Sequence, residues 1–402
     1  MTEVIEKTEY KKGYKKTKLG WIPEDWDMVK LSSVCKKIIG GGTPTTQITS
    51  YWEGNIPWIS SYDINKNGKI CVRKFITNEA IIKSATNIIP KGSIIVVTRV
   101  GLGKVALSDF SLCTSQDFQS IITNKELIIN KYLKYYISNQ INKIIKNSQG
   151  STIKGITKEQ IYNMFLMLPA LKEQKKIAEI LSAWDDGIET LEKLIEQKEI
   201  LKKATMQKLF FEKESWQMMR FDKIFKDFCK KNCPRGRLLS ATQENGVIPR
   251  DMLSGKVMSP EGSLDGYKLI EAGDFVISLR SFQGGLEYSK YRGILSPAYT
   301  VLKNIIDIDK DFYRHFFKSY KFIEKYLSIS VIGIRDGKQI SYSDLSSVKI
   351  PYPPLEEQEK IGKILNCYDE ELQLLNSKLE KLKEQKKGLM QKLLTGQIRV
   401  KV

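Results

Sequence analysis

Two long stretches of this chain place apolar residues at alternating spacings of four and three, or one every 3.5 residues on average. That period predicts an α-helix with a continuous apolar seam that packs against another helix, as in a coiled coil. The predicted seam positions are Ile177, Leu181, Trp184, Ile188 and Leu191 in the first stretch and Ile361, Leu365, Tyr368, Leu372 and Leu375 in the second. In the first stretch the pattern then loosens, because Lys198 and Lys202 occupy seam positions.

The two stretches are copies of each other. Residues 169–209 and 353–393 align without a gap and are identical at 17 of 41 positions, including an entry Pro-x-Leu-x-Glu-Gln and an exit Met-Gln-Lys-Leu. A single seam would leave its leucines in water, so we expect the two helices to pack on each other. A globular insert that returns near its start favours an antiparallel pair. An ordinary helical hairpin within a core is the alternative, but it leaves two equal copies beside two equal domains unexplained.

The similarity extends beyond the helices into the segments that precede them. Lys91–Arg99 and Ala272–Arg280 both read as a glycine turn, a buried strand and an arginine at the strand exit. Amphipathic helices are expected later in each segment, at 132–145 and 312–327. We therefore predict an α+β protein with a pseudo-twofold plan, in which each of two globular domains is followed by a long helix. The predicted segments are a mobile basic arm (1–18), domain 1 (19–168), helix 1 (169–210), domain 2 (211–352), helix 2 (353–394) and a tail (395–402).

The net charge of +19 is concentrated in the globular segments. Residues 1–168 carry a net charge of +11 and residues 211–352 carry +6, whereas both predicted helices are neutral. Positive charge gathered on two domains is typical of proteins that contact a phosphate backbone, although diffuse charge also aids solubility. The pattern favours double-stranded DNA as a partner.

Loops that differ between two otherwise similar domains are suited to reading two different sequences. Arginine at a strand exit can reach a guanine edge, and glutamine can pair with adenine. Any one such residue is more often a surface or backbone-contact residue, so the loops as a set carry the prediction. The candidate DNA-binding residues are Gly41, Gly42, Thr43, Arg99, Lys104, Gln116, Ser151, Thr152, Lys154, Arg235, Arg237, Gln243, Arg280, Gln283, Arg335 and Lys338.

Catalytic and metal-binding motifs are not evident in the sequence. A methyltransferase Asp/Asn-Pro-Pro-Tyr/Phe motif is missing, and Gly333-x-x-x-Gly337-Lys338 is one residue too short for a phosphate-binding loop. The single histidine, His315, is expected to be structural. We predict no cofactor and no metal site. The six scattered cysteines are expected to be reduced, and no apolar run reaches membrane-spanning length, so we expect a cytoplasmic protein.

The chain resembles the specificity subunits of Type I restriction-modification systems from Leu19 to its end. The resemblance lies in the Trp-Ile-Pro-Glu-Asp-Trp opening, the Gly-Gly-Thr-Pro loop, the Pro-x-Leu-x-Glu-Gln helix entries and the closing Leu-Thr-Gly-Gln-Ile-Arg. It implies two target recognition domains on an antiparallel helical spacer and a bipartite DNA target. It also implies modification (methyltransferase) subunits and restriction (motor and nuclease) subunits as partners, which supply the catalysis. The second domain lacks the Gly-Gly-Thr-Pro signature, so loop roles do not transfer directly between domains.

Two other functions are compatible with the sequence. A nuclease or methyltransferase of new design would show activity in the isolated chain. A coiled-coil adaptor that binds proteins, not DNA, would assemble in a salt-insensitive way without DNA, whereas DNA affinity falls steeply with salt.

Overall fold

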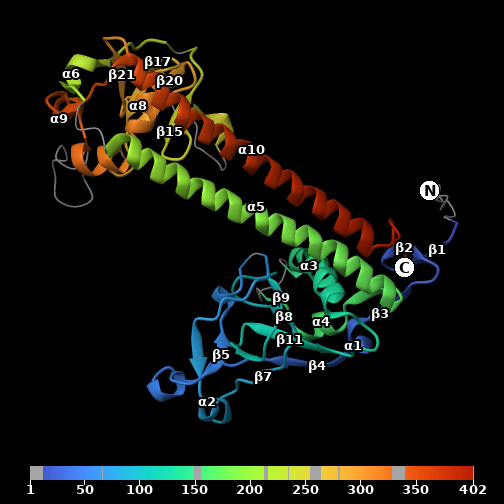
Figure 1. The fold of residues 1–402 in the computed structure, drawn as a ribbon. Coiled ribbons are helices and arrows are strands. Elements are labelled where there is room, and N and C mark those ends of the chain that lie inside the picture. The colour runs from blue at the N-terminus through green and yellow to red at the C-terminus, as the bar shows by residue number, and fades with distance from the viewer. Residues whose placement is uncertain are drawn as a thin grey trace. The chain divides into compact units, whose positions relative to one another are not determined.

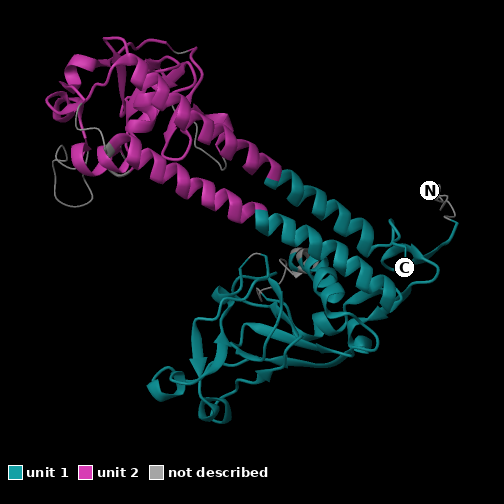
Figure 2. Ribbon diagram, in the orientation of Figure 1, with its two compact units in different colours: residues 1–190, 379–402 teal, residues 191–378 magenta. Residues whose placement is uncertain are grey.

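The computed structural model describes residues 12–65, 67–148, 155–211, 216–233, 235–253, 264–278, 281–327 and 340–401. The chain forms two compact units, of which the first contains residues 1–190 and 379–402 and the second residues 191–378 (Figure 2). Each unit contains one mixed α/β domain and parts of two long helices, α5 (Leu171–Phe211) and α10 (Leu355–Leu394) (Figure 1).

The domain of the first unit is built on a four-stranded antiparallel sheet in the order β4-β11-β8-β9. Its strands are β4 (Cys35–Gly40), β11 (Phe118–Thr123), β8 (Ile94–Val97) and β9 (Val105–Leu107). All four residues of β8 are buried because both faces of the sheet are covered: Ile94 and Val96 enter one core cluster, and Ile95 and Val97 another. Alternate side chains of a strand point to opposite faces, so this strand joins the two cores.

Further strands and helices complete this domain. A second sheet has the order β6-β5-β10-β7, and β1 pairs with β2 and β3 with β12. Its remaining strands are β1 (Tyr14–Thr17), β2 (Gly20–Pro23), β3 (Asp27–Lys30), β5 (Ile56–Ile59), β6 (Lys74–Ile76), β7 (Ile88–Ile89), β10 (Leu112–Thr114) and β12 (Phe165–Leu168). The helices are α1 (Leu31–Val34), α2 (Asn78–Ile82), α3 (Asn130–Ser148) and α4 (Lys158–Tyr162).

The domain of the second unit repeats the central sheet. The order β14-β21-β18-β19 is again antiparallel throughout, and a two-stranded pair, β13-β22, matches β3-β12. The strands are β13 (Met218–Arg220), β14 (Phe225–Phe228), β15 (Leu239–Thr242), β16 (Gly246–Pro249), β17 (Lys268–Ile270), β18 (Phe275–Ile277), β19 (Glu287–Tyr288), β20 (Gly293–Leu295), β21 (Thr300–Asn304) and β22 (Lys349–Pro351). The helices are α6 (Phe221–Ile224), α7 (Ser281–Gly284), α8 (Lys310–Phe316) and α9 (Tyr342–Ser346). The common plan expected from the sequence is thus a shared strand order.

The expected amphipathic helix at 312–327 is interrupted in the structure. α8 ends at Phe316, and a short π-helix covers Phe322–Leu327. Buried Ser319 explains the break, because its hydroxyl donates to the carbonyl of Phe316 at 2.6 Å and accepts from the amide of Phe322 at 3.2 Å. A serine hydroxyl that binds nearby backbone groups in this way competes with helix continuation.

Within each unit the two long helices run antiparallel. In the first unit Asp185 of α5 pairs with Lys386 of α10, and in the second unit Lys202 of α5 pairs with Asp369 of α10. Lys198 also reaches Glu371 at 2.7 Å, so the two lysines that interrupt the predicted seam make ion pairs across the helices. Six predicted seam residues are buried, and four are half-buried. The buried ones are Ile177, Leu181, Ile188, Leu191, Ile361 and Leu365; the half-buried ones are Trp184, Tyr368, Leu372 and Leu375.

Replacement of a buried seam residue is expected to destabilise the protein. Leu365 is completely buried in the core of the second unit, so Leu365→Ala should cost about 2–5 kcal/mol of unfolding free energy through lost burial and a cavity. Leu374→Ala on the same helix is the matched control, because Leu374 is 71% exposed. Urea unfolding should show a lowered midpoint for the first variant only, and equal midpoints would contradict the seam.

Candidate nucleic-acid interface

A tryptophan–glutamate contact joins each domain to the start of its long helix. In the first unit the indole Nε1 of Trp26 donates to Glu173 at 2.9 Å, and in the second unit Trp216 donates to Glu357 at 3.0 Å. Glu173 is only 2% exposed and also binds the guanidinium of Arg399, which in turn pairs with Asp25. The Arg399 charge and hydrogen bond lower the pKa of Asp25. The chain's C-terminal tail thereby helps to neutralise a buried carboxylate.

The glutamine that follows each of these glutamates forms hydrogen bonds with a second part of the domain. Gln174 accepts a hydrogen bond from the amide of Ile129 at 2.8 Å, and Gln358 accepts one from the amide of Asp309 at 2.9 Å. Both glutamines donate to the proline carbonyl at their own helix entry, at 2.8 Å. The sequence identified this Glu-Gln pair only as a repeated helix entry. Its role is to hold the domain on the helix.

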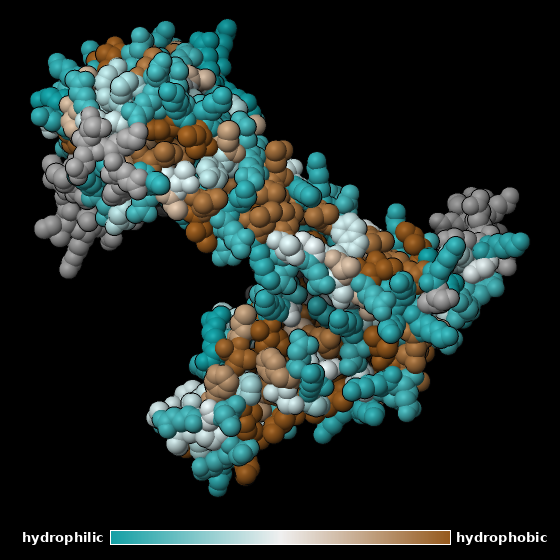
Figure 3. All heavy atoms as spheres, viewed as in Figure 1, coloured by the Kyte–Doolittle hydropathy of each residue, from teal (hydrophilic) through white to brown (hydrophobic). Residues whose placement is uncertain are grey.

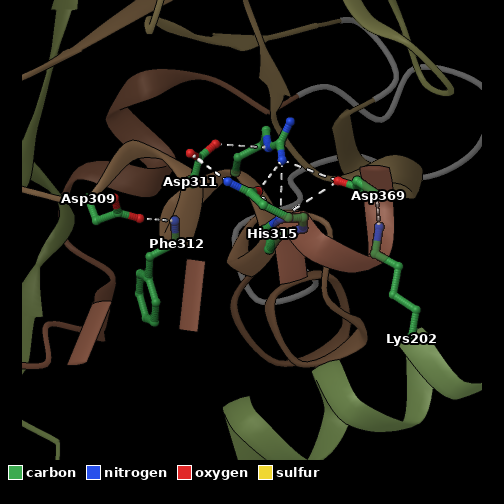
Figure 4. A network of polar contacts seen from close by, with 8 residues as sticks. Lys202, Asp309, Asp311, Phe312, His315 and Asp369 are labelled. Carbon is green, nitrogen blue, oxygen red and sulfur yellow. Dashed lines mark hydrogen bonds and ion pairs between the residues drawn. The ribbon is translucent and has the colours of Figure 1, made fainter. Parts of the chain in front are cut away.

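A polar network in the second unit connects α8 to both long helices (Figure 4). Arg314 donates to Asn366 at 2.5 Å and to Asp369 at 3.2 Å, and Asp369 also pairs with Lys202. His315 lies 3.0 Å from the Asn366 oxygen and 3.7 Å from Asp369. In the first unit Asp185 aligns with Asp369. Asp185 accepts a hydrogen bond from the Tyr135 hydroxyl at 2.6 Å and pairs with Lys386. The two units therefore use different residues for similar attachments, and His315 is buried within the attachment of the second unit.

Several candidate DNA-binding residues of the first unit come together at one edge of its domain. The amide of Gly42 donates to the Thr114 carbonyl at 2.8 Å, and the Thr43 hydroxyl donates to Gln116 at 2.6 Å. A Cβ at Gly41 would lie 2.2 Å from the Ser115 carbonyl oxygen, so only glycine fits this contact. The Gly-Gly-Thr loop and the loop that carries Gln116 thus form one rigid surface.

Arg99 belongs to the same edge through backbone contacts. The neighbouring Thr98 donates its amide to the carbonyl of Asp117 at 2.8 Å, and the amide of Ile156 donates to the Thr98 carbonyl at 2.9 Å. Arg99 itself is exposed. Lys104 differs, because its ammonium group donates to the carbonyls of Ser61 and Ile64 at 2.9 and 2.7 Å. It therefore stabilises a loop.

The sequence reading missed a lysine–tryptophan cluster beside this loop. The rings of Trp52 and Trp58 meet edge to face with centroids 5.0 Å apart, and Lys74 lies 5.2 Å from the Trp52 centroid. The indole N–H of Trp58 also donates to the Gly42 carbonyl at 3.0 Å and thereby stabilises the loop. The short distance between Trp52 and Trp58 in the sequence could have indicated this cluster.

Candidate residues of the second unit lie in two places. Gln243 lies in the turn between β15 and β16, where the Lys318 ammonium binds its carbonyl and that of Gly284 in α7. Lys318 also pairs at 2.7 Å with Glu287, a carboxylate whose pKa is raised by burial and lowered in part by this lysine. Lys318 thus ties two candidate DNA-contacting segments together.

Arg235 and Arg237 lie before β15, whereas Gln243 follows it. Arg235, Arg237 and Arg292 line a cavity of about 520 Å³. Arg237 donates to both carboxylate oxygens of Asp251, at 3.0 and 2.8 Å, and Arg292 pairs with Glu271 at 3.2 Å. Arg292 was not among the residues singled out from the sequence. Guanidinium groups at one cavity suit a phosphate or a base edge.

Ser151, Thr152, Lys154, Arg280, Arg335 and Lys338 lie outside the described residues, and so do residues 1–11 of the expected basic arm. Gln283 falls within α7, but its side chain is not described. Within the described part of the chain, no three His, Cys, Asp or Glu side chains gather as metal ligands would, and no helix is both long and apolar enough to cross a membrane.

Comparison with known proteins identifies the class to which this duplicated fold belongs. The family model for the Type I restriction modification DNA specificity domain matches the chain twice, at residues 23–200 and 213–384. The chain therefore belongs to the Type I restriction-modification DNA specificity family. Membership makes it a specificity subunit and not a catalytic subunit, which confirms the resemblance found in the sequence.

Individual relatives match either nearly the whole chain or one part of it. It is 27% identical over 429 residues to the Type I restriction enzyme MjaIX specificity subunit of Methanocaldococcus jannaschii, with 96% of each protein covered. The EcoR124I/EcoR124II specificity subunit of Escherichia coli is 31% identical over 156 residues, which cover 37% of this chain and 38% of that subunit.

Solved structures show the same fold. A chain from a study of complex assembly in a type I R-M system matches with a TM-score of 0.60 and 17% identity, covering 94% of this chain and 99% of that one. The S subunit from M. genitalium matches with a TM-score of 0.56 and 19% identity, covering 92% of this chain and 96% of its own. The predicted fold class, an α+β protein with two domains on paired long helices, is confirmed.

His315 should make stability depend on pH. Burial, together with the nearby Arg314 charge, lowers its pKa to about 4, whereas in the unfolded chain it is near 6.5. The unfolded state therefore binds a proton that the folded state does not, and stability present above pH 6.5 is lost as the pH falls toward 4. The loss should approach about 3 kcal/mol.

Urea midpoints measured between pH 7.5 and 4.5 test this effect by difference. Wild type and His315→Gln have the same carboxylates, so the difference between their curves reports the contribution of His315. The variant should lose stability less steeply than wild type as the pH falls over this range. Parallel curves would show that His315 does not contribute.

Proposed function

We propose that this chain reads a bipartite double-stranded DNA target for a Type I restriction-modification complex, with one half-site contacted by each domain. The observation that carries the proposal is the double family match on two domains that share a strand order but differ in their loops. We propose 19–168 and 211–352 as the two target recognition domains and 169–210 and 353–394 as the spacer helices. We propose 1–18 as a basic arm and 395–402 as a tail. Tyr14–Thr17 of this arm form β1, which pairs with β2 in the first unit, so this part is not the mobile segment expected from the sequence.

Electrostatics and rigid loops supply complementary parts of DNA binding. Net charges of +11 on residues 1–168 and +6 on residues 211–352 attract the phosphate backbone without regard to sequence. Exposed side chains on the joined loops of the first unit, including Thr43, Arg99 and Gln116, contact base edges. In the second unit the Gln243 turn, α7 and the arginine-lined cavity contact DNA, together with the candidate residues outside the described ranges.

The long helices bind partner subunits and set the separation of the half-sites. Apolar side chains remain exposed on them outside the seam, as the hydrophobic colouring of the surface illustrates (Figure 3). They include Leu194, Ile200 and Leu201 on α5 and Ile364 and Leu374 on α10. We propose that modification subunits dock on this surface and that restriction subunits complete the complex in the cytoplasm. The family match and the names of the relatives as Type I specificity subunits support these partners.

Methylome sequencing tests the bipartite target. Cells that carry this gene with its modification gene should methylate a split motif with a fixed gap. An in-frame deletion of 211–352 should abolish methylation at that motif, because one half-site reader is lost. If no split motif depends on the gene, the proposal is wrong.

A helix insertion tests the spacer. Seven residues added after Leu191 and after Leu379 keep the heptad phase and lengthen each helix by about 10 Å. The gap between half-sites should grow by about three base pairs, since successive pairs are about 3.4 Å apart. Insertion of seven residues after the exposed Lys125, in a turn outside the proposed DNA contacts, is a control that should leave the gap unchanged. An unchanged gap in the helix variant would contradict the spacer role.

A further inference from the structure

The arginine-lined cavity of the second unit lies on the segment that corresponds to the Gly-Gly-Thr loop of the first. In the shared strand order β14 takes the place of β4, and these strands lead into residues 229–237 and 41–55, respectively. Each segment then packs on the strand that directly precedes β21 or β11. The carbonyl of Arg237 accepts from the amide of Ile294 in β20 at 2.9 Å, and the amide of Gly42 donates to Thr114 in β10. Equivalent loops thus carry the glycines and threonine in one domain and the arginines in the other.

Backbone contacts hold the wall of this cavity in place. Asn232 has a left-handed conformation, with φ of 60°, and donates its amide to the carbonyl of Asp265 at 3.0 Å. Asparagine adopts this conformation more readily than most residues. A Cβ at Gly293 would lie 2.3 Å from the Arg237 carbonyl oxygen, so the segment lies directly against β20. The arginines are therefore carried by an ordered backbone.

Guanidinium groups supply all the charge among the described residues that line the cavity. Arg235, Arg237 and Arg292 line it, and Arg235 is exposed and makes no ion pair with a described residue. Arg237 donates to both oxygens of Asp251 through Nη2 alone, and Arg292 pairs with Glu271 through Nε. A guanidinium has five N–H groups, so each arginine keeps donors for a ligand. Three cations and two carboxylates leave one positive charge unbalanced.

This charge favours a phosphate over a base edge as the ligand. A guanine edge offers two acceptors, N7 and O6, and has no net charge, so a single guanidinium satisfies it. A phosphate carries a full negative charge on its oxygens and accepts from several guanidinium groups at once. Three guanidinium groups around one cavity match the phosphate.

We propose that the arginine-lined cavity is a phosphate-binding site that holds one backbone phosphate of the DNA target. This inference rests on the proposed function and names the DNA group that the cavity takes. Phosphate contacts position a protein on the duplex, whereas base contacts carry the sequence information. Arg235, Arg237 and Arg292 therefore supply affinity and register to the second domain without reading a base.

Replacement of Arg235 tests the site through affinity and its salt dependence. The full chain with its modification subunits is bound to a duplex carrying its methylome-derived motif, and to duplexes changed at one base pair each, over a series of salt concentrations. Arg235→Gln should weaken binding to every duplex by a similar factor of about tenfold, because a charge-assisted hydrogen bond is lost. The slope of log affinity against log salt should become shallower by up to about 0.9, the value for one phosphate.

Arg220→Gln is the matched control for the loss of one positive charge. Arg220 is an exposed arginine of the same domain that lies on β13, pairs with Asp222 and does not line the cavity. Its replacement should change affinity by less than about twofold, since salt screens a charge that lies away from the DNA.

Neutral phosphates identify the ligand directly. In a second series of duplexes, each backbone phosphate in turn is replaced by an uncharged methylphosphonate. Wild type should lose about tenfold in affinity at the phosphate that the cavity binds. Arg235→Gln should be less sensitive than wild type at that phosphate by about threefold or more, and equally sensitive elsewhere, because only interacting groups are coupled.

The possible results assign failure to distinct causes. If wild type shows no preferred split motif, the proposed function fails. If a motif exists but Arg235→Gln binds every duplex as wild type does, the cavity does not bind DNA. If the variant relaxes the preference at one base pair with an unchanged salt slope, the cavity reads a base and the phosphate assignment is wrong. Equal sensitivity of variant and wild type at every methylphosphonate would point to a free phosphate and also overturn the proposal. Retained discrimination at all base pairs shows that a weakened variant is folded.

Discussion

Buried polar side chains at the start of each long helix are the constraint on which the arrangement of each unit depends. Glu173, Gln174 and Gln358 are at most 2% exposed, and each has its hydrogen-bonding groups paired with the domain or the helix entry. A buried carboxylate or amide without partners would cost several kcal/mol, so the domain must meet the helix in the one geometry that satisfies them. Apolar packing around Trp26 and Trp216 adds to the folding stability, while the polar contacts determine the geometry in which domain and helix meet.

Reciprocal ion pairs extend this logic along the helices. Asp185 on α5 pairs with Lys386 on α10 in the first unit, and Asp369 on α10 pairs with Lys202 on α5 in the second. In the aligned copies Asp185 corresponds to Asp369, and Lys202 to Lys386. The duplicated sequence therefore supplies one aspartate and one lysine from each copy, and each unit uses one of each. Lys202, which interrupts the apolar seam of α5, thus favours the antiparallel pairing of α5 with α10.

The parts of the fold that follow from periodicity could be predicted from the sequence, while the parts that depend on long-range partners could not. Heptad spacing indicated both helices, and the match between 91–99 and 272–280 indicated equivalent strands, which became β8 and β18. The break after Phe316 was missed because the effect of Ser319 depends on its own buried contacts. Likewise, nothing local indicated that Lys104 binds carbonyls or that Arg292 joins the arginine-lined cavity.

The contacts that hold each domain and the side chains that face outward at its loops belong to different sets of residues. Trp26, Glu173 and Gln174 anchor the first domain, whereas Thr43, Arg99 and Gln116 are exposed on loops whose backbone is secured by glycine and by the sheet. Substitutions at the loop tips leave the anchors intact and so change little of the folding free energy. Selection for a new target can then act on a few codons without first having to repair a damaged core, which gives such a protein a short mutational route to a new specificity.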